Sequence, residues 1–242
     1  MIKHIQKILN FDDYDMDAMF IPAVINLTAV FYFGGIFLMN NAALIKADAL
    51  WKIVTVIVSS PLISLVFARF LVDFFRGSSK ILESVLYGKD RTRFPSTSML
   101  LLKDNSISRT LKSKIRGYLA DRGFKLLSKA KEISNEEEAR LAARDAVGFI
   151  RKCVDEQDDA IYQRKLVRYG SHRNFLGGFM YCFPICVVLF AFSILNDDTY
   201  KNINIVVLVT YAVIGLIRFF LLKRSAIEYA ECLFTSFDKI KN

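Results

Sequence analysis

The chain has few of the side chains on which catalysis usually depends. It has only two histidines, His4 and His172, in separate segments, and four cysteines that form no disulfide framework or paired metal-binding motif. It also has no glycine-rich phosphate loop, no HExxH helix and no nucleophile elbow. The sequence therefore argues against an enzyme, and it implies no cofactor and no metal site.

Charge is absent from two long stretches of the sequence, although 24% of the 242 residues are charged and 53% are hydrophobic. Residues 18–45 and 174–196 contain no charged side chain over 28 and 23 positions. A helix needs about 20 apolar residues to cross a bilayer, so each stretch is long enough to span a membrane.

Two shorter stretches match each other. Sixteen uncharged residues separate Lys52 from Arg69, and sixteen separate Lys201 from Arg218. They complete a crossing if the two arginines lie near the membrane boundary and snorkel, although a gating or ligand-binding role for these arginines stays open. We therefore predict an all-α integral membrane protein with four transmembrane helices in two hairpins, near residues 20–39, 52–72, 175–195 and 203–222.

The basic residues are concentrated between the predicted hairpins. Residues 73–174 hold 22 of the 33 Lys and Arg and have a net charge of +8, against +9 for the whole chain. The positive-inside bias places this segment and both termini in the cytoplasm, which for a bacterium means the inner membrane. The predicted parts are an N-terminal segment with or without an interfacial helix (1–19), a first hairpin (20–72), a basic helical domain (73–174), a second hairpin (175–222) and an amphipathic tail (223–242).

The segment between the hairpins is predicted to be helical. Apolar residues at i+4 spacing indicate a helix over 105–121, which Gly123 ends. Two overlapping capping boxes at 134–138 begin a second helix. A third runs from about residue 158 toward Tyr169 and joins the third span. Pro95 marks a turn or loop.

Basic side chains form a ridge on each of two predicted helices. At 100° per residue, each ridge falls within a narrow sector of its helix. Ridges of this kind fit a polyanion such as an oligonucleotide or a cyclic nucleotide, whereas a solvated face or attraction to anionic lipid are the alternatives. The candidate anion-binding residues are Arg109, Lys112, Arg116, Arg140, Arg144 and Arg151.

The predicted spans carry hydroxyl groups but no charge between their ends. The second span places Ser59, Ser60 and Ser64 around Pro61, which frees a backbone carbonyl. A kinked, hydroxyl-lined helix fits the wall of a water-filled pore. Close helix packing through small residues is the alternative interpretation.

Residues 90–178 resemble a widespread and mostly uncharacterised family of bacterial multi-pass membrane proteins. The resemblance depends on Phe94-Pro95-Ser96-Thr97 and on a closing block with Tyr169-Gly170, Arg173-Asn174 and Gly177-Gly178. The chain departs from the pattern at Arg168 and Ser171, where the family usually has glutamate and phenylalanine. The resemblance implies a membrane topology more than an activity.

The closing block is suited to joining the basic domain to the third span. Gly170 relaxes the helix, Arg173 reaches phosphate or backbone carbonyls, Asn174 satisfies a freed polar group, and the glycine pair allows close packing. These residues either couple domain movement to the membrane or form a rigid anchor. The architecture is also similar to membrane effectors of nucleotide-signalled phage-defence operons, which implies a role in antiviral defence.

The sequence leads to two functional hypotheses. The first is an oligomeric, channel-like membrane effector that is controlled by an oligonucleotide or cyclic nucleotide on its basic domain. The second is a non-conducting membrane anchor that recruits a soluble protein. The expected partners are the lipid bilayer, further copies of the chain, the anionic ligand and a soluble protein such as a nucleotidyltransferase.

Overall fold

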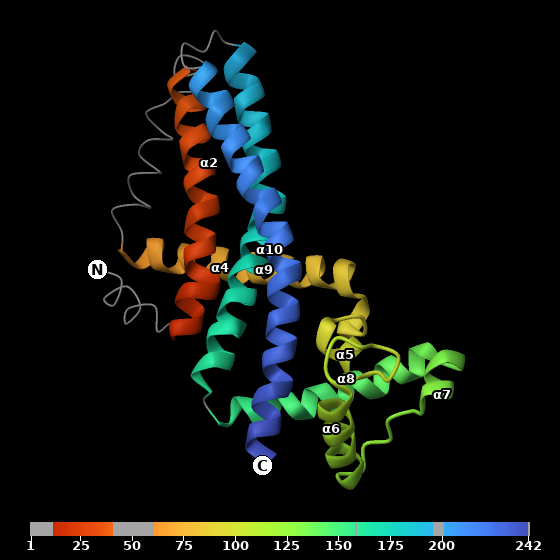
Figure 1. Cartoon of the computed structure of the whole chain (residues 1–242). Coiled ribbons are helices and arrows are strands. Elements are labelled where there is room, and N and C mark those ends of the chain that lie inside the picture. The colour runs from red at the N-terminus through yellow and green to blue at the C-terminus, as the bar shows by residue number, and fades with distance from the viewer. Residues whose placement is uncertain (1–11, 41–60, 158, 196–200, 242) are drawn as a thin grey trace. The chain divides into compact units, whose positions relative to one another are not determined.

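The structure, a computed structural model, describes residues 12–40, 61–157, 159–195 and 201–241. Every regular element in these ranges is helical, which confirms the all-α prediction for this part of the chain. The elements in chain order (Figure 1) are a π-helical turn η1 (Asp15–Phe20), α2 (Ile21–Asn40), α4 (Pro61–Tyr87), a 3-10 turn η2 (Lys89–Arg91), α5 (Pro95–Leu100), α6 (Arg109–Asp121), α7 (Lys129–Ser134), α8 (Glu136–Asp155), α9 (Ala160–Leu195) and α10 (Lys201–Lys241).

Three of the described helices are long and apolar enough to cross a membrane. They cover Asp15–Leu38, Ala160–Ile194 and Lys201–Lys241. These ranges contain all of the predicted span at 203–222 and all but the last residue of the predicted spans at 20–39 and 175–195. The predicted span at 52–72 lies partly outside the described residues, and its end belongs to α4. The chain is therefore a membrane protein with three candidate spans, and the fourth span stays a prediction.

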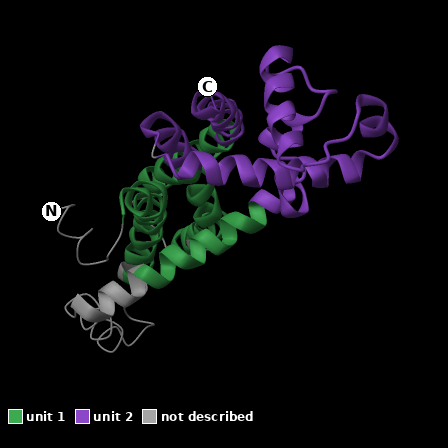
Figure 2. Ribbon diagram, turned by 90° about the horizontal axis from the view of Figure 1, so that it is seen from below, with its two compact units in different colours: residues 1–82, 170–221 green, residues 83–169, 222–242 purple. Residues whose placement is uncertain are grey.

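The chain forms two compact units (Figure 2). Unit 1 combines residues 1–82 with 170–221, and unit 2 combines residues 83–169 with 222–242. In unit 1, α2 runs alongside the membrane portions of α9 and α10, and α4 crosses these three helices at a steep angle (Figures 1 and 2).

Glycines permit the close helix contacts of unit 1. A Cβ atom on Gly177 would lie 2.7 Å from both the Phe75 carbonyl oxygen and the Ser79 amide nitrogen, so α4 touches α9 there backbone to backbone. On α10, a Cβ on Gly215 would lie 2.4 Å from the Phe179 ring. The close packing predicted for the glycine pair of the closing block is therefore present, on the α4 side.

Unit 2 has a core of aromatic side chains. Phe94, Tyr162, Tyr169 and Tyr229 are almost fully buried, and their rings contact one another. Tyr229 belongs to the last part of α10, so the predicted amphipathic tail continues the α10 helix without a break and helps to form this core.

Local sequence signals explain most of the helix ends in unit 2. Asn135 caps α8: its side chain accepts a hydrogen bond from the Glu138 amide at 3.4 Å and donates to the Glu138 carboxylate at 2.6 Å. Gly123 follows α6 with φ +86°, a conformation that favours glycine. The turn or loop predicted around Pro95 is present as a turn at residues 92–94, and Pro95 itself is the first residue of α5, where its missing N–H costs no helical hydrogen bond.

Candidate functional site

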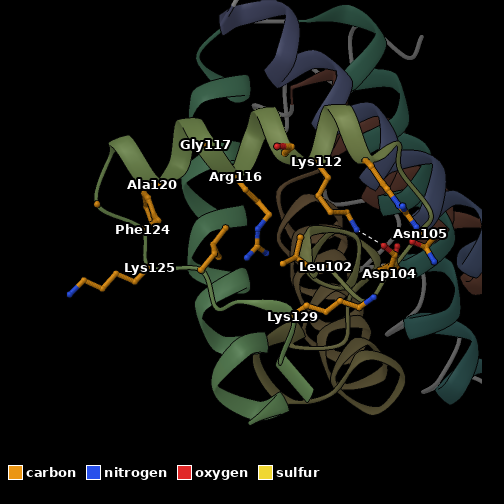
Figure 3. Close-up of a pocket in the computed structure, with 14 residues that line it drawn as sticks. Leu102, Asp104, Asn105, Lys112, Arg116, Gly117, Ala120, Phe124, Lys125 and Lys129 are labelled. Atoms are coloured by element: carbon orange, nitrogen blue, oxygen red, sulfur yellow. Dashed lines mark hydrogen bonds between the residues drawn. The ribbon is translucent and has the colours of Figure 1, made fainter. Parts of the chain in front are cut away.

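A groove with a volume of about 1060 Å³ runs along α6 and the connection that follows it (Figure 3). We call it the α6 groove. Its lining includes one carboxylate and five cations, namely Asp104, Arg109, Lys112, Arg116, Lys125 and Lys129. A cleft with such an excess of positive charge raises the local concentration of anions.

Two of the five cations belong to the wall itself. Lys112 is only 4% exposed, and its ammonium donates to the Leu101 carbonyl at 2.6 Å and to the Asp104 carbonyl at 2.5 Å. Burial lowers the pKa of Lys112, although the nearby carboxylates of Asp104 and Glu132 act in the opposite direction. Lys112 therefore closes the loop before α6, and its donors are used within the protein.

Arg116 has a similar structural role. Its guanidinium donates to the Leu100 carbonyl at 3.0 Å and to the Leu127 carbonyl at 2.5 Å, and it pairs with Glu132 at 3.1 Å. Glu132 is 1% exposed and also accepts hydrogen bonds from the backbone N–H groups of Leu102 and Lys103. This buried ion pair ties α6 to α7 and to the end of α5.

The other three cations of the groove are exposed. Arg109 lies at the N-terminus of α6, whereas Lys125 and Lys129 lie on the connection after α6 and on the first turn of α7. Within the described ranges, none of the three forms a hydrogen bond or an ion pair with the protein. Their charges are therefore available to a ligand.

Figure 3 shows how the labelled side chains are oriented. Lys112 and Lys129 both point toward Asp104, and Arg116 points into the groove, whereas Lys125 extends away from it. The Asp104 carboxylate accepts a hydrogen bond from the Ser106 amide at 2.8 Å, and this bond fixes the carboxylate in the lining of the groove. An anion in the groove would therefore meet Lys129 inside and Lys125 at the rim.

The side chains of the predicted ridge on α8 have partners within the protein. Arg140 donates to the Thr92 carbonyl and to the Ser98 hydroxyl, both at 3.2 Å, and pairs with Glu136 at 2.8 Å. Arg144 pairs with Asp145 at 2.7 Å.

Arg151 differs again, because its guanidinium lies 5.9 Å from the centre of the Tyr229 ring, against the aromatic core. Of the six candidate residues, Arg109 alone is both exposed and without a partner in the part of the chain described.

The α6 helix is attached to the last turns of α10. Lys114 pairs with Asp238 at 2.7 Å, and the Tyr118 ring packs edge-on against Phe237 with 5.4 Å between ring centres. The Lys241 ammonium lies 4.9 Å from the centre of the Tyr118 ring. Because α10 is one continuous helix from Lys201 to Lys241, α6 is in direct contact with a candidate membrane helix.

The predicted coupling residues lie in unit 1, at the level where the charge-free stretches of α2 and α9 begin. Asn174 donates to the Ala18 carbonyl at 2.7 Å and accepts from the Ser79 hydroxyl at 2.7 Å, so it joins α9 to η1 and α4. Arg173 is 7% exposed and donates to Asn174, so it does not extend outward to a phosphate, the first of the two predicted contacts; the predicted contact with backbone carbonyls stays a prediction. Gly170 packs against Tyr14 and Ala18.

Arg218 belongs to the same level. It does not snorkel outward as predicted but donates to His172 Nδ1 at 2.9 Å and lies 5.4 Å from the centre of the Phe175 ring. Arginine has no acceptor, so His172 accepts through Nδ1 in this contact. Arg69, in contrast, is exposed and pairs with Asp73 at 3.3 Å. We call Ala18, Ser79, His172, Asn174 and Arg218 the boundary layer.

The predicted pore residues cannot be placed. Ser59 and Ser60 lie outside the described residues, and so does the side chain of Ser64, although its backbone belongs to α4. Among the described residues, the apolar part of unit 1 holds several buried polar side chains, including Asn204, Ser193 and Asn26. Asn26 connects three helices. It donates to the Phe175 carbonyl at 3.0 Å and accepts from the Tyr211 hydroxyl, so it joins α2 to α9 and α10.

Compared with protein-family models, with curated proteins and with solved structures, the chain matches none of them. The resemblances stated above therefore stay predictions. The α6 groove was only partly predictable, because Lys125 and Lys129 follow the helix and belong to no helical ridge. The glycine at 123, which turns the chain back beside α6, is the signal that brings them there.

Proposed function

We propose that the chain is an oligomeric membrane effector whose α6 groove binds a phosphate-bearing ligand, a cyclic nucleotide or a short oligonucleotide. The observation that supports this best is the set of exposed cations without a partner around the groove, Arg109, Lys125 and Lys129. Phosphate is the anion that such groups bind most readily, through charge-assisted hydrogen bonds. A volume of about 1060 Å³ exceeds what inorganic phosphate needs and suits a nucleotide.

The contact of α6 with α10 supports a route from the ligand to the membrane. If α6 can occupy two orientations, a ligand that binds one of them more tightly increases the population of that orientation. Because Lys114 and Tyr118 contact Asp238 and Phe237, such a shift acts on the end of α10. In this proposal α10 transmits the signal. The boundary layer around Asn174 keeps α9 fixed against its neighbouring helices. Ion conduction by an oligomer is the expected output.

Ligand binding is tested with the full-length protein in lipid nanodiscs. Fluorescent cyclic dinucleotides and short RNA oligonucleotides serve as probes, at several salt concentrations. We expect binding to weaken as salt rises, and the substitutions Arg109→Glu and Lys129→Glu each to weaken it about tenfold or more, since each replaces an attraction with a repulsion. Lys131→Glu is the matched control, because Lys131 is exposed on the same short helix as Lys129 but does not line the groove.

The effector role is tested separately, by ion flux from liposomes that contain the protein, with and without the probe that binds. Flux that requires the probe and is lost in Arg109→Glu supports the proposal. Binding without flux, together with a monomer in detergent, would overturn the channel-like role and favour the anchor that recruits a soluble protein. No binding of any probe above the level of the Arg109→Glu variant would overturn the ligand site.

A further inference from the structure

Helix α4 has three distinct faces in the part whose side chains are described, from Arg69 onward. Val72, Phe75 and Ser79 are buried against the other helices of unit 1. Large apolar side chains are nevertheless exposed on another face, Phe70 by 61%, Phe74 by 42% and Ile81 by 56%. A third face carries the basic residues Arg69, Arg76 and Lys80, all exposed.

The helical positions of these residues separate the three faces cleanly. At 100° per residue, the exposed apolar side chains fall within about 40° of one another, and the basic side chains also fall within about 40°. The centres of these two sectors lie about 120° apart, and the buried residues occupy the remaining side. A helix in water has no reason to expose an apolar sector of this kind, whereas a helix at a membrane surface does.

The place where α4 crosses unit 1 identifies its surroundings. Phe75 and Ser79 lie against Gly177, which is close to the start of the charge-free stretch of α9. Ser79 also donates to Asn174, which in turn donates to the Ala18 carbonyl at the start of the charge-free stretch of α2. Three helices therefore meet at one level, where their sequences change from charged to apolar.

The orientation of α4 also fits a helix that lies at a membrane surface. Figures 1 and 2 show α4 running across α2, α9 and α10 rather than along them. If the three long helices cross the bilayer, a helix that runs across them at the level of Gly177 lies along the membrane surface. The side chains of α4 suit that position, because one face of the helix is apolar and the neighbouring face is basic.

We propose that α4 is an interfacial helix whose exposed apolar face enters the outer part of the hydrocarbon layer and whose basic face binds anionic lipid headgroups. Phe70, Phe74 and Ile81 are the inserting residues. Arg69 is partly neutralised by Asp73, and Asp15 interacts electrostatically with both Arg69 and Arg76. Lys80 and the remaining charge of Arg76 therefore supply most of the attraction to acidic phospholipids.

Insertion is tested by tryptophan fluorescence in the full-length protein, in a Trp51→Phe background. Phe74→Trp places an indole on the exposed apolar face, and Leu141→Trp, on the exposed side of α8 in unit 2, is the control. In phosphatidylcholine vesicles we expect blue-shifted emission from the Phe74→Trp indole and loss of its intensity when the acyl chains are brominated near the headgroup. The control should respond to acrylamide in the water instead.

The same measurement has two outcomes that overturn the proposal. Quenching of the Phe74→Trp indole by acrylamide and not by brominated lipid would place this face in water. Blue-shifted emission that neither agent quenches would place it against protein, as in a contact between copies. Phe70→Trp repeats the test on the same face, so the result does not depend on one variant folding.

Headgroup binding is tested by adding phosphatidylglycerol to the vesicles. We expect the anionic lipid to increase quenching of the Phe74→Trp indole by brominated lipid, and the double substitution Arg76→Glu, Lys80→Glu to abolish that increase while the apolar insertion remains. The control Lys131→Glu should leave the increase unchanged. An increase that persists in the double variant would show that the basic face does not bind the headgroups.

Discussion

The two units are organised in opposite ways. In unit 1 the polar groups are inside, as at Asn26 and Asn174, and large apolar side chains such as Val206 and Phe220 are more than 60% exposed. Unit 2 buries an aromatic core and exposes many charged side chains, although single apolar side chains such as Val85 and Ile133 are exposed there as well. This difference is what we expect if lipid surrounds unit 1 and water surrounds unit 2, because lipid removes the reason to bury apolar groups and water supplies it.

The cations follow the same division. The boundary layer keeps Arg218 turned inward onto His172, and Arg173 is buried beside it. Unit 2 also buries two cations, Lys112 and Arg116, but it surrounds them with carbonyls and with the Glu132 carboxylate. Interior charge in each unit is therefore structural, and only exposed cations such as Arg109 and Lys129 remain for ligands.

The largest expected effect is in the ion pair of unit 2. Glu132→Gln removes a carboxylate that is 1% exposed and leaves the Arg116 guanidinium without its counter-charge. We expect a loss of about 3–5 kcal/mol in the free energy of unfolding, the usual cost of an uncompensated buried charge. Chemical denaturation in detergent measures it. Glu137→Gln, an exposed position on the first turn of α8, should change stability by less than about 1 kcal/mol.

The next effect is at the crossing of α4 and α9 in unit 1. Gly177→Val would place a side chain against the Phe75 carbonyl and the Ser79 amide, and backbone cannot move aside cheaply. We expect a loss of about 1–3 kcal/mol, visible as a lower midpoint of thermal unfolding. Gly34→Val, also in a membrane helix, meets nothing within 4 Å. Equal stability of the two variants would contradict the close contact.

A matched loss of hydrogen bonds compares the two units directly. Lys112→Met removes two buried bonds to carbonyls in unit 2, and we expect a loss of about 2–3 kcal/mol. Asn26→Leu removes the bonds to the Phe175 carbonyl and the Tyr211 hydroxyl in unit 1, and the expected loss is about 1 kcal/mol, because helices in lipid find substitute partners when unfolded. A larger loss for Asn26→Leu than for Lys112→Met would reverse the assignment of lipid to unit 1.

The smallest expected effect is a change of stability with pH in the acid range. Hydrogen bonds from Lys103 and Arg140 lower the pKa of Glu136 from 4.5 to about 2. A carboxyl group whose pKa is lowered in the folded state stabilises the fold above its unfolded pKa, and this contribution disappears as the pH falls from about 4.5 to about 2. The difference in the midpoint of unfolding between the unchanged protein and Glu136→Gln should therefore become smaller as the pH falls through this range. Because the group is exposed, added salt should reduce the difference at neutral pH as well.

Helical periodicity and capping signals predict much of this fold. The helix over 105–121 is present as α6, Asn135 caps α8, and the segment after residue 158 does join the third span as α9. The direction of α4 was not predictable, because the stretch from Lys52 to Arg69 has the composition of a span and only the contact at Gly177 shows α4 lying across the others.

The candidate site was less predictable than the fold. Lys112, Arg140 and Arg151 belong to basic ridges in sequence, but their partners are carbonyls and aromatic rings from distant segments. A helical wheel shows which side of a helix a cation occupies and gives no information on whether another segment covers that side. Arg109 and Lys129 stay available because the groove beside them is open.

The length of α10 sets how a signal can travel. Its 41 residues extend about 60 Å as one helix, twice the roughly 30 Å of the hydrocarbon layer. If such a helix tilts in the proposed function, we expect it to pivot near Arg218, which is hydrogen-bonded to His172 in the boundary layer. A tilt of about 5° would move its end, near Asp238, by roughly 3 Å, given 1.5 Å per residue. A small displacement of α6 would thus become a change of tilt inside the bilayer.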